Sequence, residues 1–269
     1  METRYYKPRG APLSDAVQLF WQVNRDNNKF REETIVPKGV VEIIFNFLPE
    51  KTFNGKLYNG AFSMPRCFIQ GYHTGIIEMD LPDSQFLFGV VLQPAATKHI
   101  LRVPAGAFAR QCIDLTSVDA SFNALWHQLA EQGTFRGKVG CFSTWLSRRL
   151  PRLTTREHTL NNVLALKTEF PLSVPNLSER LCYSPRHLSR MFHEMTGMNS
   201  EQTLLYLKYL KAVSLIHYSG LSLTQTAYAS GFSDQSHFIK VFKSFTTLTP
   251  HAYKARKSGI PAHLFGHGR

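Results

Sequence analysis

The chain has 269 residues, and a composition of 43% hydrophobic and 19% charged residues is typical of a globular protein of about two domains. No apolar stretch reaches the roughly 18 residues of a membrane span, and the first residues lack the apolar core of a secretory signal, so we expect no membrane partner. The four cysteines are dispersed without metal-binding spacing, which predicts a reduced, cytoplasmic protein and argues against a disulfide framework or a Cys-rich zinc site.

The positive charge is concentrated in the C-terminal half. The chain carries 31 Lys and Arg against 19 Asp and Glu, a net charge of +12. Residues 1–150 hold 17 basic and 13 acidic residues, a net +4, whereas residues 151–269 hold 14 and 6, a net +8. This asymmetry favours a polyanionic partner for the C-terminal half, and a solubility surface is the alternative.

The first 118 residues have mainly the pattern of β-strands. Residues 40–47 and 86–92 form nearly continuous apolar runs, each followed by a proline, which predicts two buried strands. One helix is predicted earlier, over residues 14–21, because its apolar side chains then share one face. Four glycines are predicted to supply turns between the strands: Gly55, Gly60, Gly71 and Gly75.

Apolar residues recur at helical spacing after Asp119. The pattern predicts two amphipathic helices that end before Pro151. Packing against their own β domain is the interpretation we favour, and a dimer interface is the alternative. We therefore expect a β-rich domain over residues 1–151 that ends in two helices, followed by a polar linker over residues 152–160.

Residues 161–256 combine helical periodicity with an internal repeat. Residues 178–192 and 227–243 each predict a short helix, a turn that carries an aromatic residue, and a second helix with one buried face. A helix predicted over residues 199–218 joins the two units. Two helix-turn-helix units with basic residues on both exposed faces predict DNA binding, and an ordinary helical bundle with a basic surface is the alternative.

The exposed faces of the two second helices carry side chains that can read base edges. Arg and Lys donate to guanine, Gln pairs with adenine, and Ser contacts either. The candidate base-reading residues are Arg186, Ser189 and Arg190 in the first unit and Gln235, Ser236 and Lys240 in the second. The candidate phosphate contacts are Lys167, Lys208, Lys243 and Lys254. Carried by a rigid connector, the two helices would enter major-groove segments one helical turn, ~34 Å, apart.

This region resembles the DNA-binding domain of AraC/XylS-type transcription regulators. The match is strongest over residues 231–238, with Val241-Phe242-Lys243 and Thr249-Pro250 after them, and residues 184–192 support it. The resemblance implies seven helices, an asymmetric site in double-stranded promoter DNA, contact with RNA polymerase, and a cytoplasmic, nucleoid-associated protein. Activation is the commoner output of the family, and repression is the alternative.

The chain departs from the family pattern at a few positions. Cys182 stands in the first turn where the family often has glycine, so we expect a left-handed backbone there. Thr247 likewise stands where a glycine often precedes Thr-Pro. Thr226 replaces a usual aliphatic residue, and Lys208 replaces a frequent arginine. None of these changes removes an exposed recognition residue.

The N-terminal half is similar, more loosely, to an uncharacterised β-rich sensor domain found ahead of some AraC-type DNA-binding domains. The matching pieces are Phe20-Trp21 and residues 36–46, 69–71 and 88–96, with Lys38 where that family commonly has Asp. The resemblance implies sensing or oligomerisation, and it leaves open both a small-molecule effector and a homodimer.

No ligand, metal or cofactor site is assigned to this half. The polar groups in or beside apolar strands are Glu42, Arg66, His73 and His99. Because the two histidines are isolated, histidines with ordinary partners are the interpretation we favour over a metal site. Four strand aromatics either line an apolar pocket or, as we favour, belong to the core: Trp21, Phe45, Phe86 and Phe88.

The sequence therefore predicts an α+β multidomain protein: a β-rich N-terminal domain, linker helices and an all-α domain with two helix-turn-helix units, followed by a flexible tail over residues 257–269. We expect a sequence-specific DNA-binding transcription regulator and no enzyme, because no GxSxG, P-loop, HExxH or GxGxxG motif occurs. The alternatives are a co-regulator that has lost DNA binding and acts through protein contacts, and an enzyme of the DNA-alkyl repair type.

Overall fold

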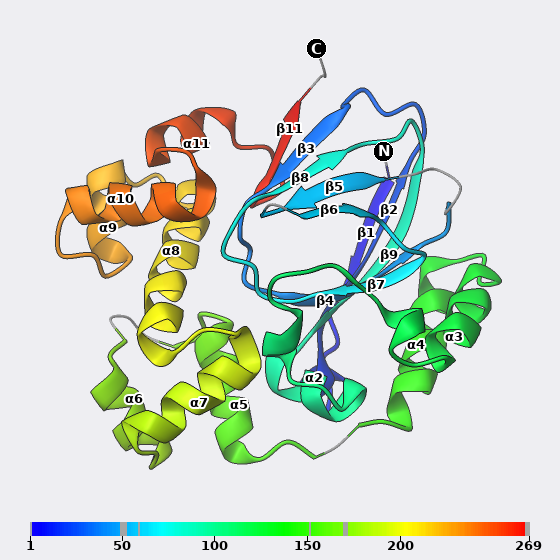
Figure 1. Cartoon of the computed structure of the whole chain (residues 1–269), viewed down its shortest axis with the longest axis horizontal. Helices are drawn as coiled ribbons and strands as arrows, with labels where there is room; N and C mark the ends of the chain where they lie inside the picture. The colour runs from blue at the N-terminus through cyan, green and yellow to red at the C-terminus, as the bar shows by residue number, and fades with distance from the viewer. Residues whose placement is uncertain (1, 49–52, 59, 151, 169–171, 267–269) are drawn as a thin grey trace.

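The computed structural model describes residues 2–48, 53–58, 60–150, 152–168 and 172–266, which build a β domain and a helical domain packed side by side (Figure 1). The β domain consists of two sheets that face each other, with helices on the outer face of the larger one. Its fold thus creates an interior between the sheets that is separate from the core beneath the helices.

All described strand pairings are antiparallel. The six-stranded sheet contains, in spatial order, β1 (Glu2–Tyr6), β2 (Val17–Arg25), β9 (Gln85–Leu92), β4 (Val41–Asn46), β7 (Cys67–Gln70) and β10 (Ile113–Asp114). The five-stranded sheet contains β11 (His263–Gly266), β3 (Glu32–Ile35), β8 (Ile77–Asp80), β5 (Asn54–Leu57) and β6 (Gly60–Ser63). β4 and β9 confirm the two strands predicted from apolar runs.

Two of the glycines predicted as turn residues lie in strands instead. Gly60 begins β6, and Gly55 lies inside β5. A Cβ at Gly55 would come within 2.6 Å of the Phe62 ring, so close packing of neighbouring strands explains this glycine. Gly71 and Gly75 lie between strands as predicted.

The helix predicted over residues 14–21 is wrong beyond its first turn. α1 spans Leu13–Ala16, and β2 begins at Val17. β2 pairs with β1 on one side and with β9 on the other. Its side chains alternate, so that Phe20 is fully buried in the core and Trp21 lies between the sheets. Pairing with strands distant in sequence therefore overrides the local helical pattern.

Three further described helices and two short 3₁₀ turns complete the β domain. They are α2 (Pro94–Leu101), η1 (Ala105–Phe108), η2 (Leu115–Ser117), α3 (Ser121–Ala130) and α4 (Phe135–Ser147). α3 and α4 cover the outer face of the six-stranded sheet (Figure 1). The Phe142 ring packs edge-on against Phe20 and Phe45, with centroids 5.8 and 6.1 Å apart. These helices therefore pack on their own domain, the interpretation that we favoured.

Seven helices form the described part of the second domain. They are α5 (Thr155–Leu164), α6 (Val174–Leu181), α7 (Pro185–Thr196), α8 (Ser200–Tyr218), α9 (Leu223–Ala229), α10 (Gln235–Thr246) and α11 (Pro250–Arg256). This number is the one that the resemblance implies. The linker predicted over residues 152–160 is wrong from Thr155 onward, because Thr154 and Glu157 form a capping box that starts α5 at Thr155.

Two tyrosines of α8 join the domains. Tyr209 donates a hydrogen bond to the carbonyl oxygen of Pro37 at 3.0 Å. Tyr206 donates to the carbonyl oxygen of His73 and accepts from the backbone N–H of Gly39, both at 3.0 Å. Both rings are fully buried, so their hydroxyls depend on these partners. Gly39 has a φ of +65°, and a Cβ there would lie 2.3 Å from a leucine of α8.

The flexible tail predicted over residues 257–269 is wrong for residues 257–266, and residues 267–269 lie outside the described part of the chain. Residues 263–266 form β11, which pairs with β3 at the edge of the five-stranded sheet. Backbone hydrogen bonds from Val36 N–H to the Ala262 carbonyl (2.9 Å) and from Arg31 N–H to the Gly266 carbonyl (3.0 Å) extend this pairing at both ends. Sheet hydrogen bonds and burial therefore order a segment whose Gly and Pro content suggests mobility.

Gly89 leaves room for the indole ring of Trp21 between the two sheets. It lies opposite Trp21 in the β2–β9 pairing, and a Cβ there would lie 1.9 Å from Trp21 Cε2. We therefore expect Gly89→Ala to displace the indole and to lower the free energy of unfolding by about 1–3 kcal/mol in urea titrations. Gly140→Ala is the control, because nothing lies within 4 Å of the added Cβ. A Gly89→Ala protein as stable as the wild type contradicts this packing.

His73 makes the domain interface sensitive to acid. Burial lowers the pKa of His73 from 6.5 to about 4, despite its hydrogen bond to the Gly75 carbonyl. Between these pH values the unfolded chain binds the proton that the folded chain does not. Stability contributed by His73 is therefore present above about pH 6.5 and falls by up to about 1.4 kcal/mol per pH unit on acidification.

Urea titrations between these pH values measure this dependence, and His73→Asn is expected to flatten it. His251→Asn is the control, because His251 is exposed on α11 and should leave the acid dependence intact. Identical slopes for the wild type and His73→Asn would exclude His73 as the group responsible.

Candidate nucleic-acid interface and ligand cavity

Helices α7 and α10 are built alike. The Ser184 Oγ accepts the His187 backbone N–H at 3.2 Å, and the Asp234 Oδ1 accepts the His237 backbone N–H at 2.8 Å, so each helix begins at a side-chain cap. Each helix buries one pair at i, i+4 spacing: Leu188 with Phe192, and Phe238 with Phe242. Burial of one face leaves the opposite face in water.

All six candidate base-reading residues lie on α7 and α10. Ser189 is half-buried, and the other five are exposed. In the part of the chain that the structure describes, none of Arg186, Arg190 and Lys240 forms an ion pair. Because no carboxylate neutralises these cations, they are available to acceptor atoms on a partner.

Two hydrogen bonds orient side chains at this surface. Arg190 Nη2 donates to His187 Nδ1 at 3.1 Å, within α7. Thr224 Oγ1 of α9 donates to Gln235 Oε1 of α10 at 3.0 Å. Because the amide oxygen of Gln235 is engaged in this way, its amide nitrogen is the group left to donate.

α8 separates the two candidate recognition helices. It has 19 residues and therefore a length of about 28 Å. α7 and α10 pack near its opposite ends (Figure 1). The length of α8 is therefore comparable to the rise of one helical turn of DNA, ~34 Å.

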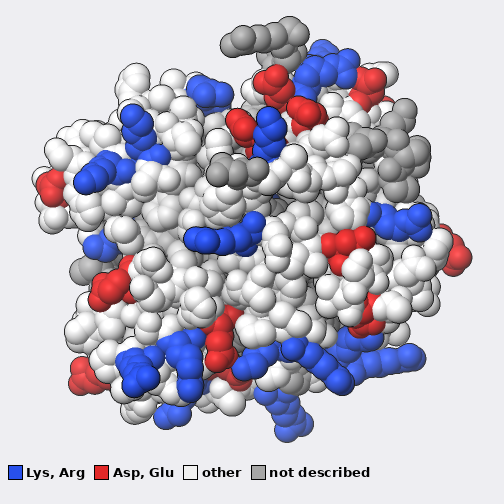
Figure 2. Space-filling model, in the orientation of Figure 1, with Lys and Arg blue, Asp and Glu red and all other residues white. Residues whose placement is uncertain are grey.

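The candidate phosphate contacts differ in their surroundings. Lys167, Lys243 and Lys254 are exposed, whereas Lys208 is half-buried, with its Nζ 5.8 Å from the centroid of the Phe232 ring. Figure 2 shows Lys and Arg side chains gathered over α6, α7 and the neighbouring edge of the molecule, with a second group over α10 and α11. Positive charge thus lies near both helix-turn-helix units.

Each unit contains two residues with a left-handed backbone. The residues in the turns are Cys182 (φ 52°) and Gly231 (φ 84°), and those after the recognition helices are Gly197 (φ 77°) and Thr247 (φ 63°). This confirms the left-handed turn that we predicted at Cys182. A side chain with a Cβ costs roughly 1–2 kcal/mol in this conformation, so each unit has one strained position.

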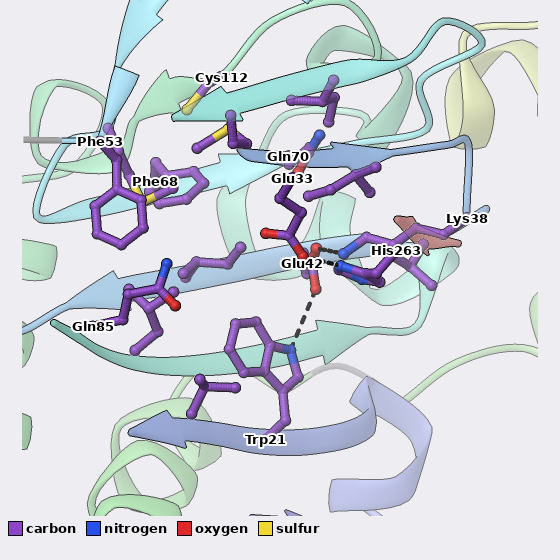
Figure 3. A pocket seen from close by; sticks show the side chains of 18 of the residues that line it. Trp21, Glu33, Lys38, Glu42, Phe53, Phe68, Gln70, Gln85, Cys112 and His263 are labelled. Atoms are coloured by element: carbon purple, nitrogen blue, oxygen red, sulfur yellow. Dashed lines mark hydrogen bonds and ion pairs between the residues drawn. The ribbon is translucent and has the colours of Figure 1, made fainter. Parts of the chain in front are cut away.

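A cavity of about 280 Å³ lies between the two sheets of the β domain (Figure 3). Leu19, Trp21 and Val23 of β2 form part of its wall, as the alternation of side chains along a strand requires. The lining is mostly aliphatic and aromatic. Figure 3 shows Phe53 and Phe68 at one end and the charged side chains at the other.

Four of the charged or titratable side chains in the lining form two pairs. Lys38 forms an ion pair with Glu42, which also accepts the Trp21 Nε1–H at 3.3 Å. His263 Nδ1 lies 2.7 Å from Glu33 Oε1 (Figure 3). Burial opposes ionisation of Glu33, but the hydrogen bond from His263 and nearby cations outweigh it and lower the pKa of Glu33.

The sequence analysis assigned no ligand site, but two of the residues that it considered line this cavity: Glu42 and Trp21. The core position that we favoured for the strand aromatics is therefore wrong for Trp21, whereas Phe45 and Phe88 belong to the core as we favoured. Phe86 packs against Phe47, with ring centroids 5.2 Å apart. The polar lining residues that were missed include Arg25, Glu33 and His263. Arg25 continues the i, i+2 pattern of β2, but the helix predicted over these residues obscured that pattern. No local sequence signal indicates that Glu33 and His263, 230 positions apart, lie together.

The remaining polar candidates have ordinary partners. His99 Nε2 lies 3.0 Å from Glu157 Oε1, and the Arg66 guanidinium lies 5.0 Å from the Trp126 ring centroid. No group of three or more His, Cys, Asp or Glu side chains suited to a metal ion occurs among the described residues. None of the helices in the described ranges is both long enough and apolar enough to span a membrane.

Comparisons with known proteins match both domains. A family described as a helix-turn-helix domain matches residues 177–256, and a domain of unknown function (DUF6597) matches residues 5–114. The multiple antibiotic resistance protein MarA of Escherichia coli K12 is 30% identical over 97 residues, which are 36% of this chain and 76% of MarA. The chain belongs to the AraC/XylS family.

A second relative and a solved structure resemble this chain to different extents. The transcriptional activator RhaS of Salmonella arizonae is 30% identical over 111 residues, which are 40% of each chain, so this chain spans less than half of that relative. The structure of ToxT from Vibrio cholerae with an unsaturated fatty acid bound has a TM-score of 0.52 at 14% identity, over 90% of this chain and 97% of ToxT. The two proteins thus share a fold that includes both domains.

Substitution of Cys182 tests whether its left-handed backbone strains this AraC/XylS-family domain. Cys182→Gly removes the Cβ from a left-handed position, so we expect it to raise the free energy of unfolding by about 1 kcal/mol and to raise Tm. Cys182→Ala is the matched control, because it removes the thiol but keeps the Cβ. Equal stabilisation by both variants would assign the effect to the thiol and not to the backbone.

Proposed function

We propose that the protein is a sequence-specific DNA-binding transcription regulator in which α7 and α10 enter successive major-groove segments of a promoter and the β domain modulates this binding. The observation that carries the proposal is the set of exposed cationic and amide side chains on both helices, with no ion pair to the cations among the described residues. Membership of the AraC/XylS family supports it.

The side chains divide into base-reading and phosphate-binding groups. In this proposal Arg186, Arg190 and Lys240 donate to guanine edges, and Gln235 donates through its amide nitrogen. Ser189 and Ser236 supplement these contacts. The proposed phosphate contacts are Lys167, Lys208, Lys243 and Lys254, which supply salt-dependent affinity without sequence preference.

The cavity between the sheets is the proposed effector site. It is mostly apolar and carries a few polar groups at one end, which is the usual character of a small-molecule site. The fatty acid named for the ToxT structure supports an effector in a protein of this fold. The transcriptional activator RhaS is a relative, which supports activation as the output. We propose that this output proceeds through contact with RNA polymerase, in the cytoplasm and without catalysis.

The test begins with selection of preferred sites from a randomised DNA library by the full-length protein. Fluorescence-anisotropy titrations at two salt concentrations then compare the selected site with random DNA. A preference of ~10³-fold or more supports a specific regulator. Equal and steeply salt-dependent binding to all sequences contradicts the proposal and favours a co-regulator that acts through protein contacts.

Arg190 and Lys240 hold equivalent positions in the two units, so their removal should have similar effects. We expect Arg190→Ala and Lys240→Ala each to weaken binding to the selected site by about 1–3 kcal/mol, and binding to random DNA much less. Lys254→Ala is the control, because loss of a phosphate contact weakens binding to both DNAs equally and reduces the salt slope by about 1. Equal losses on both DNAs would reassign Arg190 and Lys240 to phosphate.

A further inference from the structure

The C-terminal segment forms part of the cavity wall. Ile260 and His263 line the cavity together with side chains from the β domain. Residues 257–262 connect the end of α11 directly to β11, which pairs with β3. The cavity is therefore lined in part by a segment that continues from the second helix-turn-helix unit.

The charged groups that line the cavity balance one another. Two cations, Arg25 and Lys38, accompany two carboxylates, Glu33 and Glu42, and His263 adds a positive charge only when it is protonated. The side chains of Lys38 and Glu42 are only 18% and 2% exposed. A charged ligand would add an unpaired charge to this buried site, which is unfavourable.

The rest of the lining suits an apolar molecule with a hydrogen-bonding group. Burial raises the pKa of the Cys112 thiol to about 12, so this group is neutral. Gln70 and Gln85 offer uncharged amides at the wall (Figure 3). An apolar cavity of about 150 Å³ holds benzene, so one of about 280 Å³ holds roughly eleven non-hydrogen atoms.

We propose that the cavity binds an uncharged, mainly apolar molecule of roughly eleven non-hydrogen atoms, and that its occupancy is relayed to the second helix-turn-helix unit by the C-terminal segment. The relay part rests on the proposed DNA-binding function. The ligand class follows from the charge balance and does not depend on that function.

A short series of contacts leads from the cavity to α10. His263 pairs with Glu33 in the cavity, and the backbone N–H of its neighbour Ala262 donates to the Tyr253 hydroxyl at 3.2 Å. The Tyr253 ring is fully buried and packs edge-on against Phe242 of α10, with centroids 5.4 Å apart. A change in the position of β11 therefore acts on the packing of the second recognition helix.

Three ligands with one chain and different head groups test the ligand class. Calorimetry of the full-length protein at about pH 8, where an ordinary histidine is neutral, compares 1-decanol, decanoate and decylammonium. We expect decanol to bind at least about tenfold more tightly than either ion, a difference of ~1.4 kcal/mol. Tighter binding of decanoate, tighter binding of decylammonium, or no binding of decanol overturns the ligand class.

Variants of the Lys38–Glu42 ion pair should shift the ligand preference toward ions of opposite charge. Glu42→Gln leaves the Lys38 charge unpaired and should favour decanoate, whereas Lys38→Met leaves the Glu42 charge unpaired and should favour decylammonium. The double variant Lys38→Met with Glu42→Gln restores the balance and should again prefer decanol. It also serves as the folding control, because replacing both partners avoids an unpaired buried charge.

A reversible cross-link tests the relay. A Cβ added at Gly266 would lie 3.5 Å from the Glu32 Cβ, within the Cβ–Cβ range of a disulfide, so Glu32→Cys with Gly266→Cys should lock β11 to β3. We expect decanol to change the affinity of the wild type for its selected DNA site about fivefold or more. This response should disappear in the oxidised variant and return on reduction, and each single variant should respond like the wild type.

The outcomes separate the two parts of the inference from the proposed function. A decanol response that survives in the oxidised variant, or decanol binding with no effect on DNA affinity, overturns the relay. Absence of any DNA sequence preference contradicts the proposed function itself, and the calorimetric comparison then still decides the ligand class.

Discussion

The buried hydroxyls of Tyr206 and Tyr209 hold the two domains in one arrangement. Both lie on α8, which separates the helix-turn-helix units, and both find their partners in the backbone of the β domain. A buried hydroxyl without a partner costs on the order of 1–3 kcal/mol. A rotation of the helical domain against the β domain would therefore break the hydrogen bonds of both tyrosines. The position of both recognition helices thus depends on residues 37–39 and 73.

The same backbone loop also reaches the cavity. The Lys38 side chain pairs with Glu42 in the cavity wall, while the neighbouring Pro37 and Gly39 bond to α8 through their backbones. On another side, the C-terminal segment supplies Ile260 and His263 to the wall. The cavity is thus bordered by two segments tied to the helical domain, which is the arrangement that a coupling between ligand and DNA sites requires.

The two recognition helices divide stability and recognition between opposite faces. Caps and buried aromatic side chains hold each helix in place, so the exposed residues are not needed for the stability of the helix. The left-handed residues Cys182 and Thr247 show that the domain tolerates local strain next to these helices. Their counterparts in the other unit are Gly231 and Gly197, which adopt the same conformation without a Cβ.

Features that depend on neighbouring residues could be predicted from the sequence. The two helix-turn-helix units, the exposed side chains of α7 and α10 and the strands β4 and β9 follow from patterns within a few residues, whereas the left-handed turn at Cys182 was predicted from the family resemblance. Long-range contacts, in contrast, make residues 17–25 a strand, add residues 263–266 to a sheet, and bring Glu33 to His263 across 230 positions. Capping and helical periodicity are local, whereas strand pairing and buried ion pairs join distant segments whose mutual stabilisation exists only in the folded chain.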